Sequence, residues 1–208
     1  MEIPAERLEG WLERFGERNG ALSWDAEPGR VTVWAANGAT AVCAVPFPPL
    51  EVRPQAEYGG LLEHVLRERR IGVLLVRKGG YAAGVFLGSV LVSSKVGSRL
   101  VQGRSAAGGS SQQRFARRRE NQAKQAYAAA ADTAARVLLP AIAHLEAVVL
   151  GGDRRALDAT LDDSRLAALR PLLVERILSV VEPRLRVLQA TPAQFRGLHL
   201  DIIDPPAP

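Results

Sequence analysis

Hydrophobic and polar positions follow two different periods along the first half of the chain. Apolar residues at helical spacing predict amphipathic helices over residues 4–19 and 56–69. Alternating or continuously apolar runs, with turn pairs such as Asn37-Gly38 between them, predict strands over residues 30–36, 40–45, 71–77, 81–87 and 90–96. The first half is therefore expected to be an α+β layer with a mostly antiparallel sheet of about five strands.

The pattern changes after residue 96. Residues 97–111 are rich in glycine and serine and have too few apolar residues to bury a face, so they are predicted to form an exposed, mobile loop. A long helix is predicted over residues 112–139, because its apolar positions keep the helical period and Pro140 marks its end. The last third is predicted to contain a strand over 145–150, a helix over 153–161, a strand near 198–203 and a frayed tail over 204–208.

Size and composition are typical of a globular protein. The 208 residues are 47% hydrophobic and 24% charged. This length fits one domain or at most two small ones, and we predict a single domain over residues 1–208. The longest apolar run, residues 81–92, is too short to cross a membrane, and five glutamates occupy residues 1–20, where a secretory signal would be apolar. The single cysteine, Cys43, has no partner for an internal disulfide and lies in a predicted strand as a small core residue. We expect a cytoplasmic protein with no membrane partner.

Positive charge is concentrated in one segment. The chain has 27 lysines and arginines against 22 aspartates and glutamates, a net charge of +5. Between residues 95 and 125, Glu120 is the only acidic residue, whereas the basic residues are Lys95, Arg99, Arg104, Arg114, Arg117, Arg118, Arg119 and Lys124. Such focusing is typical of a surface that binds the phosphates of a nucleic acid, and a solvated charged helix face is the alternative.

Common enzymatic and metal-binding motifs are absent from the sequence. It contains no Cys-x-x-Cys, His-Glu-x-x-His, phosphate-loop or Gly-x-Ser-x-Gly motif. The histidines His64, His144 and His199 fall on different predicted elements, and acidic pairs such as Asp162-Asp163 lie where helix capping explains them. We therefore expect neither a metal nor a cofactor.

The junction between the predicted loop and the long helix combines several features that favour an anionic ligand. Gly108-Gly109-Ser110-Ser111-Gln112-Gln113 leads into Arg114-Phe115-Ala116-Arg117-Arg118-Arg119. The start of a helix offers free backbone N–H groups and a positive dipole end, and the planar guanidinium of arginine suits phosphate. Arg114, Arg117 and Arg118 recur at positions i, i+3 and i+4, so they form one stripe. A flexible linker before a solvated helix is the alternative interpretation.

The order of these residues resembles the central catalytic domain of archaeal and eukaryotic class-one release factors. In that family a Gly-Gly-Gln tip precedes a helix that begins Ser-Ala-Leu-Arg-Phe-Ala-Arg. Here Arg114-Phe115-Ala116-Arg117 matches the helix and Gly108-Gly109 matches the glycines, whereas Ser110 occupies the family's glutamine position. Gly109-Ser110-Ser111-Gln112 fits the Gly-x-x-Gln motif of a related group, the release-factor-like peptidyl-tRNA hydrolases typified by Vms-one of the ribosome quality-control pathway. Only the loop and the start of the helix carry a specific resemblance.

The resemblance implies hydrolysis of the ester between a nascent peptide and the 3′-terminal adenosine of tRNA on stalled large ribosomal subunits. Its implied partners are the large subunit, rRNA and peptidyl-tRNA, with the protein a monomer off the ribosome. Gly108 and Gly109 would let the backbone approach the ester, and Gln112 would shape the site for the attacking water. The residues implied to bind RNA are Lys95, Arg99, Arg104, Arg114, Arg117, Arg118, Arg119 and Lys124.

The choice between the two glutamines depends on the helix cap. Ser110 and Gln113 have the spacing of a capping box, which would occupy Gln113 and leave Gln112 free. If Ser111 is the cap, the two glutamines are not separable. Two other functions remain open: a non-catalytic module that binds the ribosome or RNA, and a nuclease that cleaves tRNA near its 3′ end.

Overall fold

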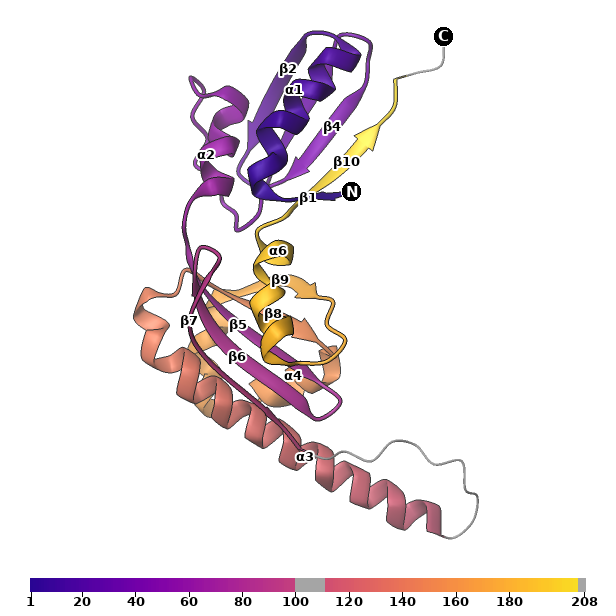
Figure 1. Ribbon diagram of the computed structural model, residues 1–208, viewed down its shortest axis with the longest axis vertical. Helices are drawn as coiled ribbons and strands as arrows, with labels where there is room; N and C mark the ends of the chain where they lie inside the picture. The colour runs from indigo at the N-terminus through magenta and orange to yellow at the C-terminus, as the bar shows by residue number, and fades with distance from the viewer. Residues whose placement is uncertain (100–110, 206–208) are drawn as a thin grey trace. The chain divides into compact units, whose positions relative to one another are not determined.

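The computed structural model describes residues 1–99 and 111–205, and for residues 111–116 the backbone alone. The described residues divide into two compact units, one made of Met1–Glu68 with the segment from Pro192 onward, the other of Arg69–Thr191 (Figure 1). The sequence analysis predicts a single domain and allows two small ones. Two units form because the chain leaves the first after Glu68 and returns to it at Pro192, so each has a hydrophobic core of its own. The α+β fold class is confirmed.

The first unit is a five-stranded antiparallel sheet in the order β1-β10-β4-β3-β2. Its strands are β1 (Glu2–Ile3), β2 (Leu22–Glu27), β3 (Arg30–Ala35), β4 (Thr40–Ala44) and β10 (Leu198–Ile203). Its helices are η1 (Ala5–Arg7), α1 (Leu8–Asn19), η2 (Glu57–Gly60), α2 (Leu61–Leu66) and α6 (Pro192–Phe195), of which η1 and η2 are 3-10 helices. Leu8, Trp11, Leu12 and Phe15 of α1 are buried, as their spacing predicts, against strand residues that include Cys43.

Two predictions for the first unit need correction. The helix predicted over 56–69 is shorter, because Tyr58, Gly59 and Gly60 have φ values of 51°, 67° and 91°. Only Leu61–Leu66 continues as α-helix. Strand β2 was not predicted, although its burial alternates strictly along the strand.

The second unit is a mixed sheet in the order β7-β6-β5-β8-β9. Its strands are β5 (Arg70–Arg77), β6 (Gly80–Leu87), β7 (Val90–Ser98), β8 (Ala147–Gly152) and β9 (Leu173–Leu178). β5, β6 and β7 are antiparallel neighbours, whereas β5 pairs with β8, and β8 with β9, in parallel. The prediction that all five early strands share one sheet is therefore wrong. β5 is central and almost entirely buried, as its continuous apolar run indicates.

Helices cover both faces of this second sheet. The helices that follow β7 are α3 (Ser111–Leu138), the 3-10 helix η3 (Leu139–His144), α4 (Arg154–Leu161), the 3-10 helix η4 (Ser164–Leu172) and α5 (Leu185–Ala190). Ala83 and Val85 of β6 share a core with α3, α4 and η4. Gly84, between them in sequence, faces Leu188 of α5. α3 and α5 therefore lie on opposite faces.

The elements predicted after residue 96 are present, apart from the boundary of the loop. The long helix, the strand and helix that follow it, and the last strand are present as α3, β8, α4 and β10. β7 continues through Ser98, so the predicted loop over 97–111 begins later than expected. From residue 100 to 110 this loop lies outside the described residues, as does the predicted frayed tail beyond residue 205.

Candidate functional site

The second half of α3 is anchored on the sheet of the second unit. Ala126, Ala130, Ala131, Ala134 and Leu138 are buried in one stripe of the helix. All of them except Ala126 share a core with strand residues of β5, β6 and β8. Four of these five side chains are alanine methyl groups, so the backbone of α3 can approach the sheet closely. This half of the helix is therefore held in place by its packing on the sheet.

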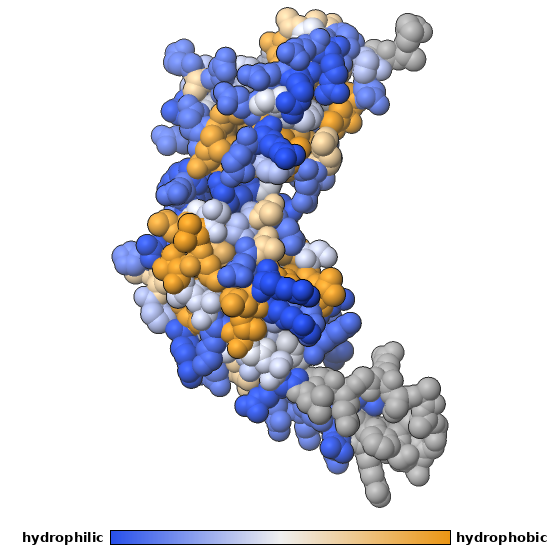
Figure 2. Space-filling model, viewed as in Figure 1, coloured by the Kyte–Doolittle hydropathy of each residue, from blue (hydrophilic) through white to orange (hydrophobic). Residues whose placement is uncertain are grey.

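The described side chains in the first half of α3, from Arg117 onward, are exposed or half-buried. Arg117, Arg118 and Lys124 are exposed, and Arg119 is half-buried. Figure 2 shows a hydrophilic surface over this part of the described helix. Between Ser111 and Ala126, the first buried residue among the described side chains of α3, the helix rises about 22 Å at about 1.5 Å per residue. The basic residues predicted on this helix thus extend beyond its anchored half.

Glu120, the single acidic residue of this basic stretch, pairs with a lysine. The Lys124 Nζ lies 3.0 Å from Glu120 Oε1, one helical turn earlier. This hydrogen bond lowers the pKa of the Glu120 carboxyl, and the positive charges of Lys124, Arg117 and Arg155 lower it further. Glu120 therefore stays ionised and compensates Lys124, while the arginines of the helix keep their excess charge.

Strand β7 brings two further predicted cations to this unit. Lys95 pairs with Ala83, whose side chain belongs to the core beneath α3, so Lys95 lies on the face of the sheet that α3 covers. Lys95 is exposed. Arg99, also exposed, donates its backbone N–H to the Gly79 carbonyl oxygen at 2.8 Å. The structure thus places Lys95 on the same face as the basic helix.

The other predicted site residues are described in part or not at all. Gly108, Gly109, Ser110 and Arg104 lie outside the described residues. Gln112, Gln113 and Arg114 lie in the first turn of α3, where only the backbone is described. Both glutamines therefore lie at the N-terminal end of α3. The choice between them, and the capping box that starts at Ser110, stay predictions.

The end of β7, where the chain departs toward the predicted loop, packs tightly against an aromatic ring. Gly97 pairs with Tyr81, and a Cβ built on Gly97 would lie 2.5 Å from Cε2 of that ring. Tyr81 itself is 8% exposed and belongs to the core under α3. Gly97 therefore supplies a close approach between β7 and this core, rather than the loop flexibility that the sequence suggested.

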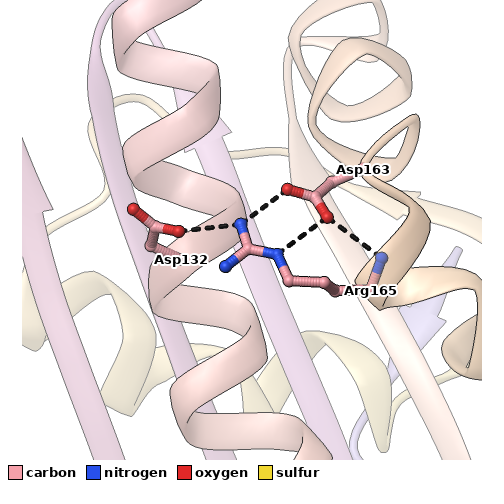
Figure 3. A network of polar contacts seen from close by, with 3 residues as sticks. All are labelled: Asp132, Asp163 and Arg165. Atoms are coloured by element: carbon pink, nitrogen blue, oxygen red, sulfur yellow. Dashed lines mark hydrogen bonds and ion pairs between the residues drawn. The ribbon is translucent and has the colours of Figure 1, made fainter.

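An arginine that sequence reasoning missed joins α3 to η4 (Figure 3). Arg165 Nη2 donates to Asp132 Oδ1 on α3 at 2.7 Å and to Asp163 Oδ2 at 2.6 Å. Asp163 also accepts from the backbone N–H of Arg165 at 3.0 Å, so it caps η4. These hydrogen bonds lower the pKa of Asp163 to about 2. The three residues, here called the Arg165 clamp, link the anchored half of α3 to its neighbour η4 at the surface.

The remaining nucleophilic and metal-binding side chains are dispersed. Burial raises the pKa of the Cys43 thiol to about 12. His64 Nε2 lies 2.9 Å from the Pro46 carbonyl oxygen, and His199 Nε2 lies 3.0 Å from Asp201 Oδ1. Within residues 1–99 and 111–205, no group of three or more His, Cys, Asp or Glu is placed to hold a metal ion. The same residues include no helix long and apolar enough to span a membrane.

Charge divides sharply between the two units. The second unit contains 20 of the 27 lysines and arginines and 9 of the 22 aspartates and glutamates, a net charge of +11. The first unit contains the other 7 basic and 13 acidic residues, a net charge of −6. The excess of basic residues is therefore spread over the whole second unit. It is larger than the excess within residues 95–125 that the sequence analysis found. Such a field attracts polyanions.

A comparison with protein families matches mainly the second unit. A family model described as "Actinobacteria/chloroflexi VLRF1 release factor" matches residues 69–201, which is more than half of the chain and includes all of the second unit. The chain is similar to the crystal structure of an archaeal translation termination factor, aRF1, with 14% identity and a TM-score of 0.46 over 93% of this chain and 73% of that chain. It is also similar to a structure described as "Archaeal protein", with 15% identity and a TM-score of 0.39 over 78% of this chain and 50% of that chain. No curated protein matches the chain.

Proposed function

Because the chain belongs to the Actinobacteria/chloroflexi VLRF1 release factor family, we propose that it is a ribosome-associated peptidyl-tRNA hydrolase. It would release nascent peptides from tRNA on stalled large ribosomal subunits in the cytoplasm, and act as a monomer. The observation that carries the proposal is the build of α3. One half is anchored in the core, and the other carries the exposed Arg117 and Arg118 and has the two glutamines in its first turn.

The proposed reaction is ester hydrolysis. Water adds to the ester carbonyl, the bond to the ribose oxygen breaks, and the products are a peptide carboxylate and a tRNA with a free terminal hydroxyl. Gly108 and Gly109 would allow the backbone to approach the ester, since glycine has no Cβ to collide with it. Gln112, at the start of α3, would position the water. A backbone N–H that steadies the oxyanion typically contributes on the order of 10²–10³ in rate.

The surrounding cations would hold the substrate rather than react with it. Arg117, Arg118 and Lys95 are exposed on the second unit. With Arg99, Arg104, Arg114, Arg119 and Lys124, they would neutralise rRNA and tRNA phosphates. No described side chain of α3 is an evident general base, so the proposal assigns proton transfer to rRNA and the tRNA ribose. Activity is therefore expected on ribosomal subunits and not on free peptidyl-tRNA.

Peptide release from purified large subunits that carry peptidyl-tRNA tests the proposal. Wild-type protein is expected to free the peptide, and Gln112→Ala to abolish most release while its binding to subunits is retained. Gln113→Ala, changed one residue further along the same turn, is the matched control and is expected to release peptide well. If Gln113→Ala is the inactive variant instead, the two glutamines exchange roles.

Two results would favour the alternative functions. If wild type and both glutamine variants bind subunits but none releases peptide, the protein is a docking module for RNA. If the freed peptide still carries nucleotides, the enzyme cleaves tRNA near its 3′ end. Mass spectrometry of the released product distinguishes hydrolysis from tRNA cleavage.

A further inference from the structure

Helix α4 adds two consecutive arginines to the basic surface beside α3. Asp153 caps α4, since its carboxylate accepts the backbone N–H of Ala156 at 2.9 Å. The next two residues, Arg154 and Arg155, are exposed. The buried side of α4, which includes Leu157, shares a core with α3, and the two helices lie beside each other (Figure 1). Packing therefore fixes both arginines next to the basic helix.

The two arginines differ in how their charge is compensated. Arg154 Nε lies 3.4 Å from Asp158 Oδ1, one turn further along α4. Arg155 forms no ion pair within the part of the chain that the structure describes. The carboxylate of Glu120 on α3 lies within electrostatic range of Arg155 and of Arg117, but Lys124 already hydrogen-bonds it. Three cations from two helices therefore share one carboxylate.

This arrangement opposes what helix stability alone would favour. The first turn of a helix carries a positive dipole end, so carboxylates are stabilising there and arginines are not. An excess of cations becomes favourable when a polyanion lies across it, because each neutralised phosphate releases a counterion. The guanidinium fork also matches phosphate oxygens in pairs. An RNA backbone accounts for a charge placement that the folded protein by itself does not need.

We propose that Arg155 of α4 and Arg117 of α3 together bind one segment of RNA backbone, so that the RNA surface spans two helices. The inference rests on the proposed function, in which α3 meets RNA, and extends the contact to an element that the sequence motif does not include. The ligand chemistry is a phosphodiester chain, which either tRNA or rRNA would supply.

The test is the salt dependence of binding. Arg155→Ala and Arg117→Ala are titrated against deacylated tRNA and against vacant large ribosomal subunits over a series of salt concentrations. Each variant is expected to weaken binding several-fold and to reduce the slope of log affinity against log salt by about 0.7–0.9. The control is Arg186→Ala, which removes an exposed arginine of α5 on the opposite face of the sheet and is expected to change neither quantity.

The outcomes separate this inference from the proposed function. An effect confined to tRNA or confined to subunits supports the inference and identifies the RNA. Unchanged affinity and slope for Arg155→Ala on both RNAs overturn it, and the hydrolase proposal then still stands on peptide release. If wild type releases no peptide while Arg155→Ala weakens RNA binding, the RNA contact holds and the hydrolase fails.

Discussion

Replacing Gly97 by alanine is expected to destabilise the second unit by about 1–3 kcal/mol, the usual range for an overpacked core. The added Cβ would lie 2.5 Å from Cε2 of Tyr81 and 2.7 Å from Cζ and Oη, well inside the optimal carbon separation of about 3.5–4.0 Å. The ring has little room to retreat, because Tyr81 is 8% exposed and packs in the core under α3. Either the ring or strand β7 must shift, and both are held by this core.

Urea and thermal unfolding followed by circular dichroism measure the effect. One kcal/mol corresponds to a shift in melting temperature of about 2–8 °C for domains between small and medium size. Each unit has a hydrophobic core of its own, so amide hydrogen exchange of β6 and β7 is used to assign the loss to the second unit. Gly29→Ala is the control, because a Cβ there meets nothing within 4 Å, and its stability is expected to stay within about 0.5 kcal/mol of wild type.

A double-mutant cycle tests the steric explanation itself. In a Tyr81→Leu background the ring is gone, so Gly97→Ala is expected to cost much less than in wild type. An equal cost in both backgrounds would refute the assignment of the strain to the Tyr81 ring. A cost below about 0.5 kcal/mol in wild type would show that the strand adapts freely and would refute it as well.

Two further predictions concern carboxylates that cap helices. The bonds from Arg165 lower the pKa of Asp163 from 3.8 to about 2, so their contribution to stability is present above about pH 4 and is lost as pH falls through about 2. The difference in urea midpoint between wild type and Arg165→Ala is therefore expected to be larger at pH 7 than at pH 2, and an equal difference would contradict a charge-dependent clamp. Asp153→Ala removes the cap of α4 and is expected to cost about 1 kcal/mol, whereas Asp162→Ala, at the other end of the same helix, is expected to be nearly neutral in the same assay.

The local sequence pattern predicted helices and strands but not which strands pair with one another. α1, β3, β4, α3 and α4 were found because helical or alternating periods and the Asn37-Gly38 turn are encoded in neighbouring residues. Assignment to two sheets was missed, since β4 obtains its neighbour from β10 and β5 obtains its neighbour from β8, both far along the chain. The missed strand β2 did carry a local signal, the alternation of Leu22, Trp24 and Ala26 with polar residues.

The candidate site was likewise predicted from the sequence only in part. The exposure of Arg117 and Arg118 follows from the amphipathic pattern of α3, which the sequence contains. The Arg165 clamp depends on Asp132, 33 residues earlier, and a pair at that separation has no signature in a single sequence. The electrostatic influence of Arg155 on Glu120 likewise depends on how α4 packs on α3. The sequence therefore indicated one basic segment, whereas in the structure the whole second unit is basic.

The build of α3 explains why its anchored half matters for the exposed half. A helix segment of about 15 residues is marginal by itself in water, so the packed alanine stripe must supply the turns from which the exposed half propagates. A small change in the direction of the helix also becomes a large displacement at its start: over about 22 Å, a tilt of about 5° moves the end by about 2 Å. Misplacement of a catalytic group by about 1 Å can cost about 10²-fold in rate. Replacing Arg165 or Asp132, which link α3 to η4, should therefore have a large effect on the proposed peptide release. The effect on stability should be small, because their ion pair is exposed and weak.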